Sequence, residues 1–171
     1  MKKASGLFVC ISILALITGS CKIKDRNTET VAETSARKMS MAWLLAGDNY
    51  KAWAIESFTV NKVDQLKDLE SCQLDNLDLY YRNLVFESVE GNTRCKTTDS
   101  DLRGRGKWTL NADSTGIEIK LGQQFHSLQI IELTQTRFHY KADNDGQITE
   151  AVFRSVDYRP ETTISADTTH E

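Results

Sequence analysis

The stretch KWTLNADSTGIEIKL, residues 107–121, contains two alternations of apolar and polar residues on either side of a turn signal. In its second half, Ile117, Ile119 and Leu121 alternate with charged residues, so an extended chain places all three aliphatic side chains on one face. The first half, KWTLN, alternates in the same way. The polar segment DSTG, residues 113–116, favours a reversal of the chain between them. The stretch therefore predicts an antiparallel hairpin with one apolar face.

The same pattern recurs along most of the chain. We expect further strands at residues 50–60, 77–81, 84–90, 127–133, 137–142 and 147–156. Turns are expected at residues 134–135 and at residues 143–146, where the sequence reads DNDG. Seven or eight short strands with little helix predict an all-β domain, either a sandwich or a closed barrel.

Helices are expected at two places. The segment ARKMSMAWLLAG, residues 36–47, predicts a short helix that ends at Gly47, because glycine readily adopts the left-handed conformation that follows a helix. The segment VDQLKDL, residues 63–69, predicts at most two helical turns. With 171 residues, 40 % of them apolar, the chain has the length of one domain with appendages.

The first 20 residues have the order of a secretory signal peptide. A basic start is followed by an apolar run at residues 7–17 and by small residues at 18–20. A helix of that run would span roughly 16 Å, about half of a bilayer core, so we expect no permanent transmembrane helix. Removal of residues 1–20 takes away two lysines and changes the formal charge from −3 to −5.

Cys21 stands where the apolar run ends, and two signal peptidases could cut before it. The sequence TGSC, residues 18–21, resembles a bacterial lipobox, although Thr18 stands where leucine is usual. We expect Cys21 to carry acyl chains such as palmitate and to begin a flexible linker that ends at residue 35. By resemblance to lipoproteins, Lys22 favours the outer membrane and leaves the leaflet open. The ordinary signal peptidase would leave Cys21 without acyl chains.

Two further cysteines, Cys72 and Cys95, lie in the folded part, whereas Cys10 is removed with the signal peptide. In an oxidising compartment we expect them to form a disulfide, which would stabilise the fold by about 3 kcal/mol. Half of a metal site is the alternative. It lacks partners, because the chain contains no C-x-x-C motif and only three histidines.

The charge distribution excludes some partners. An acidic mature chain argues against nucleic acid, because neutralising phosphates requires a basic face. The compact basic cluster RGRGK, residues 103–107, is expected to form a solvated hairpin tip. The chain shows no motif that identifies a protein partner.

Catalytic and metal-binding constellations are not recognisable. His126 and His139 are expected on neighbouring strands roughly 13 Å apart, too far to share a metal ion. Asp143 and Asp145 belong to the turn DNDG and lack the distal glutamate of a Ca²⁺ loop. We therefore expect a protein that is not an enzyme and that has neither a cofactor nor a metal.

Several motifs occur in a fixed order: LLAG, YKAW, CQLDN, a second cysteine, GKWTLNADSTGIEI and SLQIIELTQTRFHYK. Over residues 40–156 they resemble the lipocalin-like domain of exported bacterial lipoproteins. Tyr50 departs from the family, which usually has tryptophan there, and Asn76 stands in place of aspartate. The resemblance implies a small antiparallel up-and-down barrel of the lipocalin or calycin type at residues 36–157, after a short helix. We expect the polar tail, residues 158–171, to be disordered.

Aromatic residues on the expected strands are the candidate ligand-binding residues. They are Trp53, Phe86, Trp108, Phe138 and Tyr140. An eight-stranded barrel is just wide enough to hold side chains or one small ligand, so these rings either fill the interior or line a cavity. The resemblance also implies that an arginine of the last strand stacks over the first-strand tryptophan, with Arg154 over Trp53 as the candidate pair.

Two functions fit this sequence. The first is a non-enzymatic lipoprotein, lipid-anchored in the cell envelope, whose barrel binds or carries a small apolar ligand. The second is an envelope scaffold or assembly protein with a filled barrel, which acts through protein contacts. Both barrels share one pattern of apolar and polar residues, so the volume of the interior cavity distinguishes them.

Overall fold

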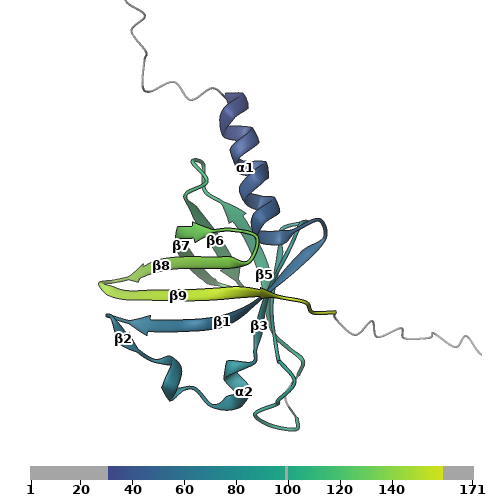
Figure 1. Cartoon of the computed structure of the whole chain (residues 1–171), viewed down its shortest axis with the longest axis vertical. Helices are drawn as coiled ribbons and strands as arrows, with labels where there is room; N and C mark the ends of the chain where they lie inside the picture. Colours follow the sequence, from purple (N-terminus) through teal and green to yellow (C-terminus); the bar gives the residue numbers. More distant parts are fainter. Residues whose placement is uncertain (1–30, 99, 160–171) are drawn as a thin grey trace, which may run out of the picture.

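The computed structural model describes residues 31–98 and 100–159, and these form a closed antiparallel barrel of eight strands with one projecting helix (Figure 1). The strands are β1 (Tyr50–Val60), β2 (Val63–Asp64), β3 (Leu77–Tyr81), β4 (Val85–Val89), β5 (Leu102–Leu110), β6 (Gly116–Leu121), β7 (Gln124–Leu133), β8 (Arg137–Asn144) and β9 (Gln147–Val156). The helices are α1 (Val31–Ala46), the short α2 (Ser71–Leu74) and a 3₁₀ turn at Leu66–Asp68. The expected all-β barrel with an N-terminal helix is confirmed.

The strands follow an up-and-down order. From β3 to β9 each strand pairs with the next, β1 pairs with β3, and β1 also pairs with β9, which closes the barrel. The two-residue β2 pairs only with the end of β1 and lies outside the closed ring. This continuous ring excludes the sandwich that the strand pattern alone also allowed.

The hairpin predicted at residues 107–121 forms as expected, from β5 and β6. Trp108 pairs with Ile119 and Leu110 with Ile117, so the apolar residues of both strands share the inner face. The turn DNDG is also confirmed. Asp145 and Gly146 have φ angles of 53° and 87°, and the amide of Gly146 donates to the Asp143 carboxylate.

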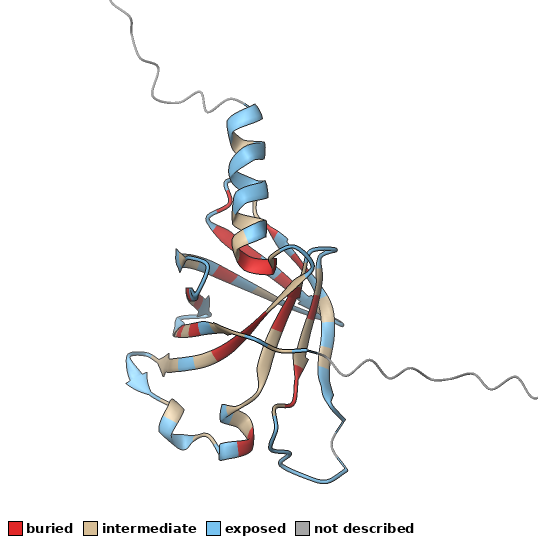
Figure 2. Ribbon diagram, turned by 45° about the vertical axis from the view of Figure 1, so that its right-hand side comes forward, coloured by how far each residue is buried: buried red, intermediate tan, exposed pale blue. Residues whose placement is uncertain are grey.

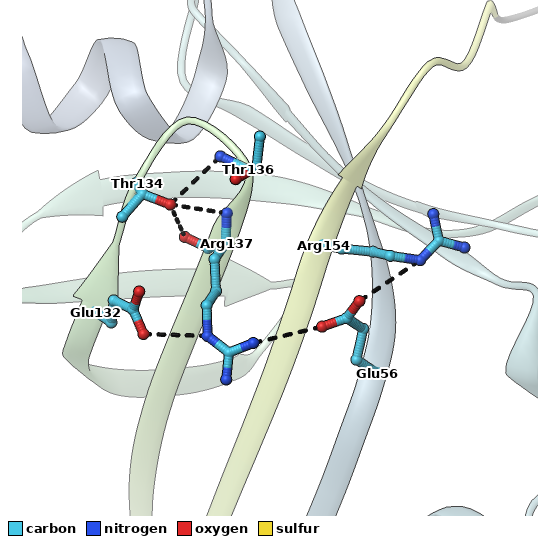
Figure 3. Close-up of polar contacts among 6 residues, drawn as sticks. All are labelled: Glu56, Glu132, Thr134, Thr136, Arg137 and Arg154. Atoms are coloured by element: carbon cyan, nitrogen blue, oxygen red, sulfur yellow. Dashed lines mark hydrogen bonds and ion pairs between the residues drawn. The ribbon is translucent and has the colours of Figure 1, made fainter.

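An ion-pair network spans the seam between β1 and β9 (Figure 3). Arg137 and Arg154 are cross-strand partners, and the Glu56 carboxylate lies 3.5 Å from the first and 3.7 Å from the second. Arg137 also contacts Glu132 at 3.1 Å. The side chains are substantially exposed, so we expect each pair to contribute at most about 1 kcal/mol. Glu56 offsets the repulsion between two arginines that would otherwise face each other.

One half of the barrel is filled by large side chains. The fully buried ones include Leu45, Trp53, Trp108, Ile117 and Phe138. The Phe138 ring contacts the Trp53 ring edge-on at a centroid distance of 5.7 Å. Burial of such rings is the main favourable term for a domain of this size.

Helix α1 begins at Val31 and includes residues 31–35, which were predicted to be a flexible linker. Most of its length is exposed, and only its last turn is buried against the barrel, at Leu45 and Ala46 (Figure 2). The predicted end at Gly47 is confirmed, since Gly47 has φ 62° and its amide donates to the Trp43 carbonyl. In the described part of the chain, no helix is both long enough and apolar enough to span a membrane.

The motif YKAW attaches this helix to the barrel. Trp53 donates from its indole nitrogen to the Leu45 carbonyl at 2.9 Å, and the Lys51 ammonium donates to the Leu44 carbonyl at 2.6 Å. These are helix-terminal carbonyls that have no partner within the helix. The Lys51 nitrogen also lies 5.2 Å from the centre of the Trp53 ring. The predicted cation over Trp53 was therefore wrong, because Arg154 pairs with Glu56 on the outer surface.

The motif CQLDN organises the loop after β4. Cys72 and Cys95 form the predicted disulfide, with Cα atoms 5.1 Å apart. The Asn76 side-chain oxygen accepts from the Gly91 amide, and the Asp75 carboxylate accepts from the Thr93 amide at 2.7 Å. This motif is structural. The helix predicted at residues 63–69 is reduced to the 3₁₀ turn, and α2 follows it.

The predictions for the chain ends fall mainly on residues outside the described ranges. These include the signal peptide at residues 1–20, the acylated Cys21, the linker up to residue 30 and the tail from residue 160 onward. Tyr158, the first residue of the predicted tail, is half-buried, and its carbonyl accepts a hydrogen bond from the Tyr50 hydroxyl.

Candidate functional site

A cavity of about 190 Å³ occupies the half of the barrel that the large core side chains do not fill. It is lined by Asp78, Tyr80, Phe86, Ile119, Leu121, His126, Leu128 and Tyr140. Two of these residues, Leu121 and His126, flank the β6–β7 turn. The end of α1 lies near the β7–β8 loop instead, since Lys51 donates to the carbonyls of both Leu44 and Gln135. These two turns are at opposite ends of β7, so the cavity lies toward the end of the barrel opposite α1.

Two glycines of β5 lie on the inner face of the barrel, next to residues that line the cavity. Gly106 pairs with Phe86 and Gly104 pairs with Ser88, so both glycines occupy inner-face positions. A Cβ atom at Gly106 would lie 2.0 Å from the Lys120 carbonyl oxygen, so this glycine allows a close approach of β6. A Cβ atom at Gly104 would meet only the Leu121 side chain, at 3.9 Å. The segment RGRGK is thus part of β5, and the predicted hairpin tip was wrong.

Asp78 is the one carboxyl group among the residues that line the cavity. It is the cross-strand partner of Ser88, and the Ser88 hydroxyl favours its ionised form. Desolvation raises the pKa of Asp78 to about 6, against the opposing effects of Ser88 and the Arg103 charge. The Arg103 side chain contacts the buried Glu90 carboxylate at 3.2 Å. Within the described ranges, Asp78 has no ion pair of its own.

The tyrosines of the cavity stay neutral at physiological pH. Burial raises the pKa of Tyr80 and of Tyr140, and the nearby Asp78 charge raises both further. The Tyr80 ring packs edge-on against Phe86, with centroids 5.1 Å apart. The cavity therefore combines aromatic walls, two phenol groups, one imidazole and one carboxyl group.

The candidate ligand-binding residues separate into two groups. Phe86 and Tyr140 line the cavity. Trp53, Trp108 and Phe138 are almost completely buried in the filled half and do not line it. The selection by aromatic character missed Asp78 and His126. The alternation in LDLYY was no guide to Asp78, because a second apolar cluster that includes Leu79 covers the outer face of β3 and Asp78 faces inward.

The two strand histidines have different surroundings. His126 lines the cavity, whereas His139 pairs with Glu132 and lies 3.9 Å from the Glu150 carboxylate. Ile130 pairs with Tyr140, and the irregularity that follows Ile130 places His139 opposite Glu132. In the described residues, the one cluster with metal-binding geometry is Glu70, Cys72 and Cys95, and the disulfide occupies both of its sulfur atoms.

Comparison with known proteins adds no assignment. No protein-family model matches the chain, and a search of curated proteins finds no significant match to it.

Proposed function

We propose that this protein binds a small, partly apolar molecule inside its barrel, without catalysing a reaction on it. The observation that supports this proposal is the cavity beside Phe86 and Tyr140, in a barrel whose other half is tightly filled. A scaffold with a filled barrel would not need this space. The proposal therefore ranks ligand binding above the scaffold alternative.

The size of the cavity limits the ligand. Cavities that hold drug-sized molecules have volumes of roughly 300–1,000 Å³, and an apolar cavity of about 150 Å³ holds benzene. At about 190 Å³, the space suits one aromatic ring or a short chain with a polar group. A long acyl chain would not fit without movement of the walls.

We further propose that the protein is an exported lipoprotein of the lipocalin-like type, anchored in the outer membrane through acylated Cys21. The support is the signal-like start, the lipobox-like sequence before Cys21 and the order of the barrel motifs. The disulfide between Cys72 and Cys95 is compatible with an oxidising compartment.

Filling the cavity tests ligand binding. In Gly104→Leu the new side chain would enter the space beside Leu121, whereas Thr109→Leu adds the same side chain on the exposed face of the same strand. Full-length protein is screened by ligand-observed NMR against small aromatic and aliphatic compounds. We expect the wild type and Thr109→Leu to bind the same compounds and Gly104→Leu to lose them. Binding that survives in a folded Gly104→Leu variant would contradict the proposal.

Metabolic labelling with palmitate tests the anchor. The wild type should incorporate the label, and Cys21→Ser should remain unlabelled and unprocessed. Cys10→Ser, which changes a cysteine inside the predicted signal peptide, is the matched control and should be labelled normally. Equal labelling of Cys21→Ser and wild type would refute acylation at this position.

A further inference from the structure

Asp78 lies inside the barrel without a fixed counter-charge. The Ser88 hydroxyl that acts on it is neutral, and the Arg103 guanidinium is engaged by Glu90. No arginine, lysine or histidine nitrogen lies within 4.0 Å of the Asp78 carboxylate in the described part of the chain. A desolvated carboxylate in such a place costs stability and attracts any cation that can reach it.

Aromatic rings surround the same space. Tyr80 and Phe86 face the cavity from β3 and β4, and Tyr140 faces it from β8. The faces of aromatic rings carry partial negative charge and attract ammonium groups. The two phenols stay protonated and neutral, so they add hydrogen-bonding groups without adding a charge.

We propose that the cavity binds a small organic ammonium ion, with the charged nitrogen at Asp78 and the apolar part of the ligand against Tyr80, Phe86 and Tyr140. This inference rests on the proposed ligand-binding function and names the class of ligand. The ammonium group supplies the counter-charge that the protein does not provide, and it forms a charge-assisted hydrogen bond with the carboxylate. A ligand with a carboxylate, such as a fatty acid, is repelled by the same group.

A purely structural role for Asp78 makes a different prediction. Asparagine keeps the shape and the polarity of the side chain opposite Ser88, so a structural role would be preserved in Asp78→Asn. Selection between ligands by charge would be lost in that variant. The two roles can therefore be separated by ligand preference, independently of folding.

Benzylamine, benzyl alcohol and benzoate are suitable probes, because they share one ring and carry a positive, zero and negative charge at pH 7.5. Full-length wild type, Asp78→Asn and Asp157→Asn are titrated with each probe by NMR. Asp157 is exposed and follows β9, so its variant is the control for a change in total charge. We expect the wild type and Asp157→Asn to bind benzylamine at least about 10-fold more tightly than benzyl alcohol and to bind no benzoate. Asp78→Asn should lose this preference.

The pH profile gives a second, independent readout. Benzylamine stays cationic between pH 8 and pH 5, whereas Asp78 becomes protonated near pH 6, so the preference of the wild type should fall across this range. His126 on β7 also faces the cavity, and Arg103 on β5 acts on Asp78 but keeps its charge. His126→Gln should retain the pH dependence, and Asp78→Asn should lose it.

The outcomes separate this inference from the proposed function. Equal affinity of the wild type for benzylamine and benzyl alcohol, with both lost in Gly104→Leu, overturns the ammonium ligand and leaves ligand binding intact. Loss of the preference in Asp157→Asn as well as in Asp78→Asn also overturns it, because a general charge effect would then be the cause. Failure of every neutral and charged compound to bind overturns both proposals.

Discussion

The indole nitrogen of Trp53 donates a hydrogen bond of 2.9 Å to the carbonyl oxygen of Leu45, eight residues earlier in the chain. Both residues are completely buried. The bond joins the first strand of the barrel to the last turn of α1 at a carbonyl that the helix itself cannot satisfy. Together with Lys51, Trp53 explains why a helix that is exposed along most of its length keeps a fixed position at one end of the barrel.

Trp53→Phe should therefore reduce stability more than a loss of ring area alone suggests. The variant keeps an aromatic ring but leaves the Leu45 carbonyl buried without a partner, which costs about 1–3 kcal/mol in addition to the smaller volume. Urea unfolding measures the difference. Trp43→Phe is the matched control, because the Trp43 indole bonds to the exposed Asp48, and it should cost less than about 1 kcal/mol. Equal losses of unfolding free energy in the two variants would show that the buried hydrogen bond contributes no more to stability than the exposed one.

Asp78→Asn should stabilise the protein at neutral pH. Folding raises the pKa of Asp78 from 3.8 to about 6, so between these values the folded state binds more protons than the unfolded state. The free energy of unfolding therefore decreases as the pH rises from 4 to 6, by roughly 2–3 kcal/mol from this group. The gain from Asp78→Asn should be present at pH 7.5 and nearly absent at pH 4.

Thermal unfolding at both pH values measures this effect. Asp157→Asn removes an exposed carboxylate of the same type and should change the melting temperature little at either pH. A gain in Asp78→Asn that is the same at pH 4 and pH 7.5 would argue against desolvation as the cause.

The two glycines of β5 should respond differently to alanine. Gly106→Ala would place a Cβ atom 2.0 Å from the Lys120 carbonyl, and the forced separation of β5 and β6 should cost about 1–3 kcal/mol. Gly104→Ala meets only the Leu121 side chain at 3.9 Å and should be neutral or slightly stabilising, because alanine reduces the entropy of the unfolded chain. Urea unfolding of the pair is the measurement, and similar losses would contradict the different roles given to the two positions.

Loss of the disulfide should reduce stability by about 3 kcal/mol. Cys72 and Cys95 close a loop with a sequence separation of 23, which restricts the unfolded chain. The double variant Cys72→Ser/Cys95→Ser should unfold at lower urea concentration than the wild type, and a reductant should lower the wild type to the same midpoint. A reductant that also shifted the double variant would indicate an effect unrelated to this bond.

The strand pattern was predictable because the alternation of residues reports directly which face each side chain occupies. The prediction failed at β5, because the glycines on the inner face of this strand resemble turn residues when only the sequence is considered. Whether Gly104 lies in a turn or opposite Ser88 is decided by pairing with β4, which a local pattern does not contain.

The cavity was not predictable for the same reason. Asp78 and Tyr80 share the inner face, but the outer face of β3 is also apolar, at Leu79, so the polarity of the strand does not identify its interior. Likewise the cation over Trp53 comes from Lys51, two residues away on the same strand, rather than from the strand paired with it. Aromatic residues alone identified Phe86 and Tyr140 as cavity residues, and register was needed for the others.

The placement of α1 has a consequence for how a ligand would arrive. The helix has 16 residues, about 24 Å of length, and it meets the barrel at the end away from the cavity. The chain before Val31 therefore joins the molecule at the free end of α1, while the cavity lies toward the opposite end of the barrel. If the protein is anchored through Cys21 as proposed, its cavity would lie at the end of the barrel away from the helix through which the chain continues toward that anchor. The proposal would then favour ligands that arrive from the aqueous compartment.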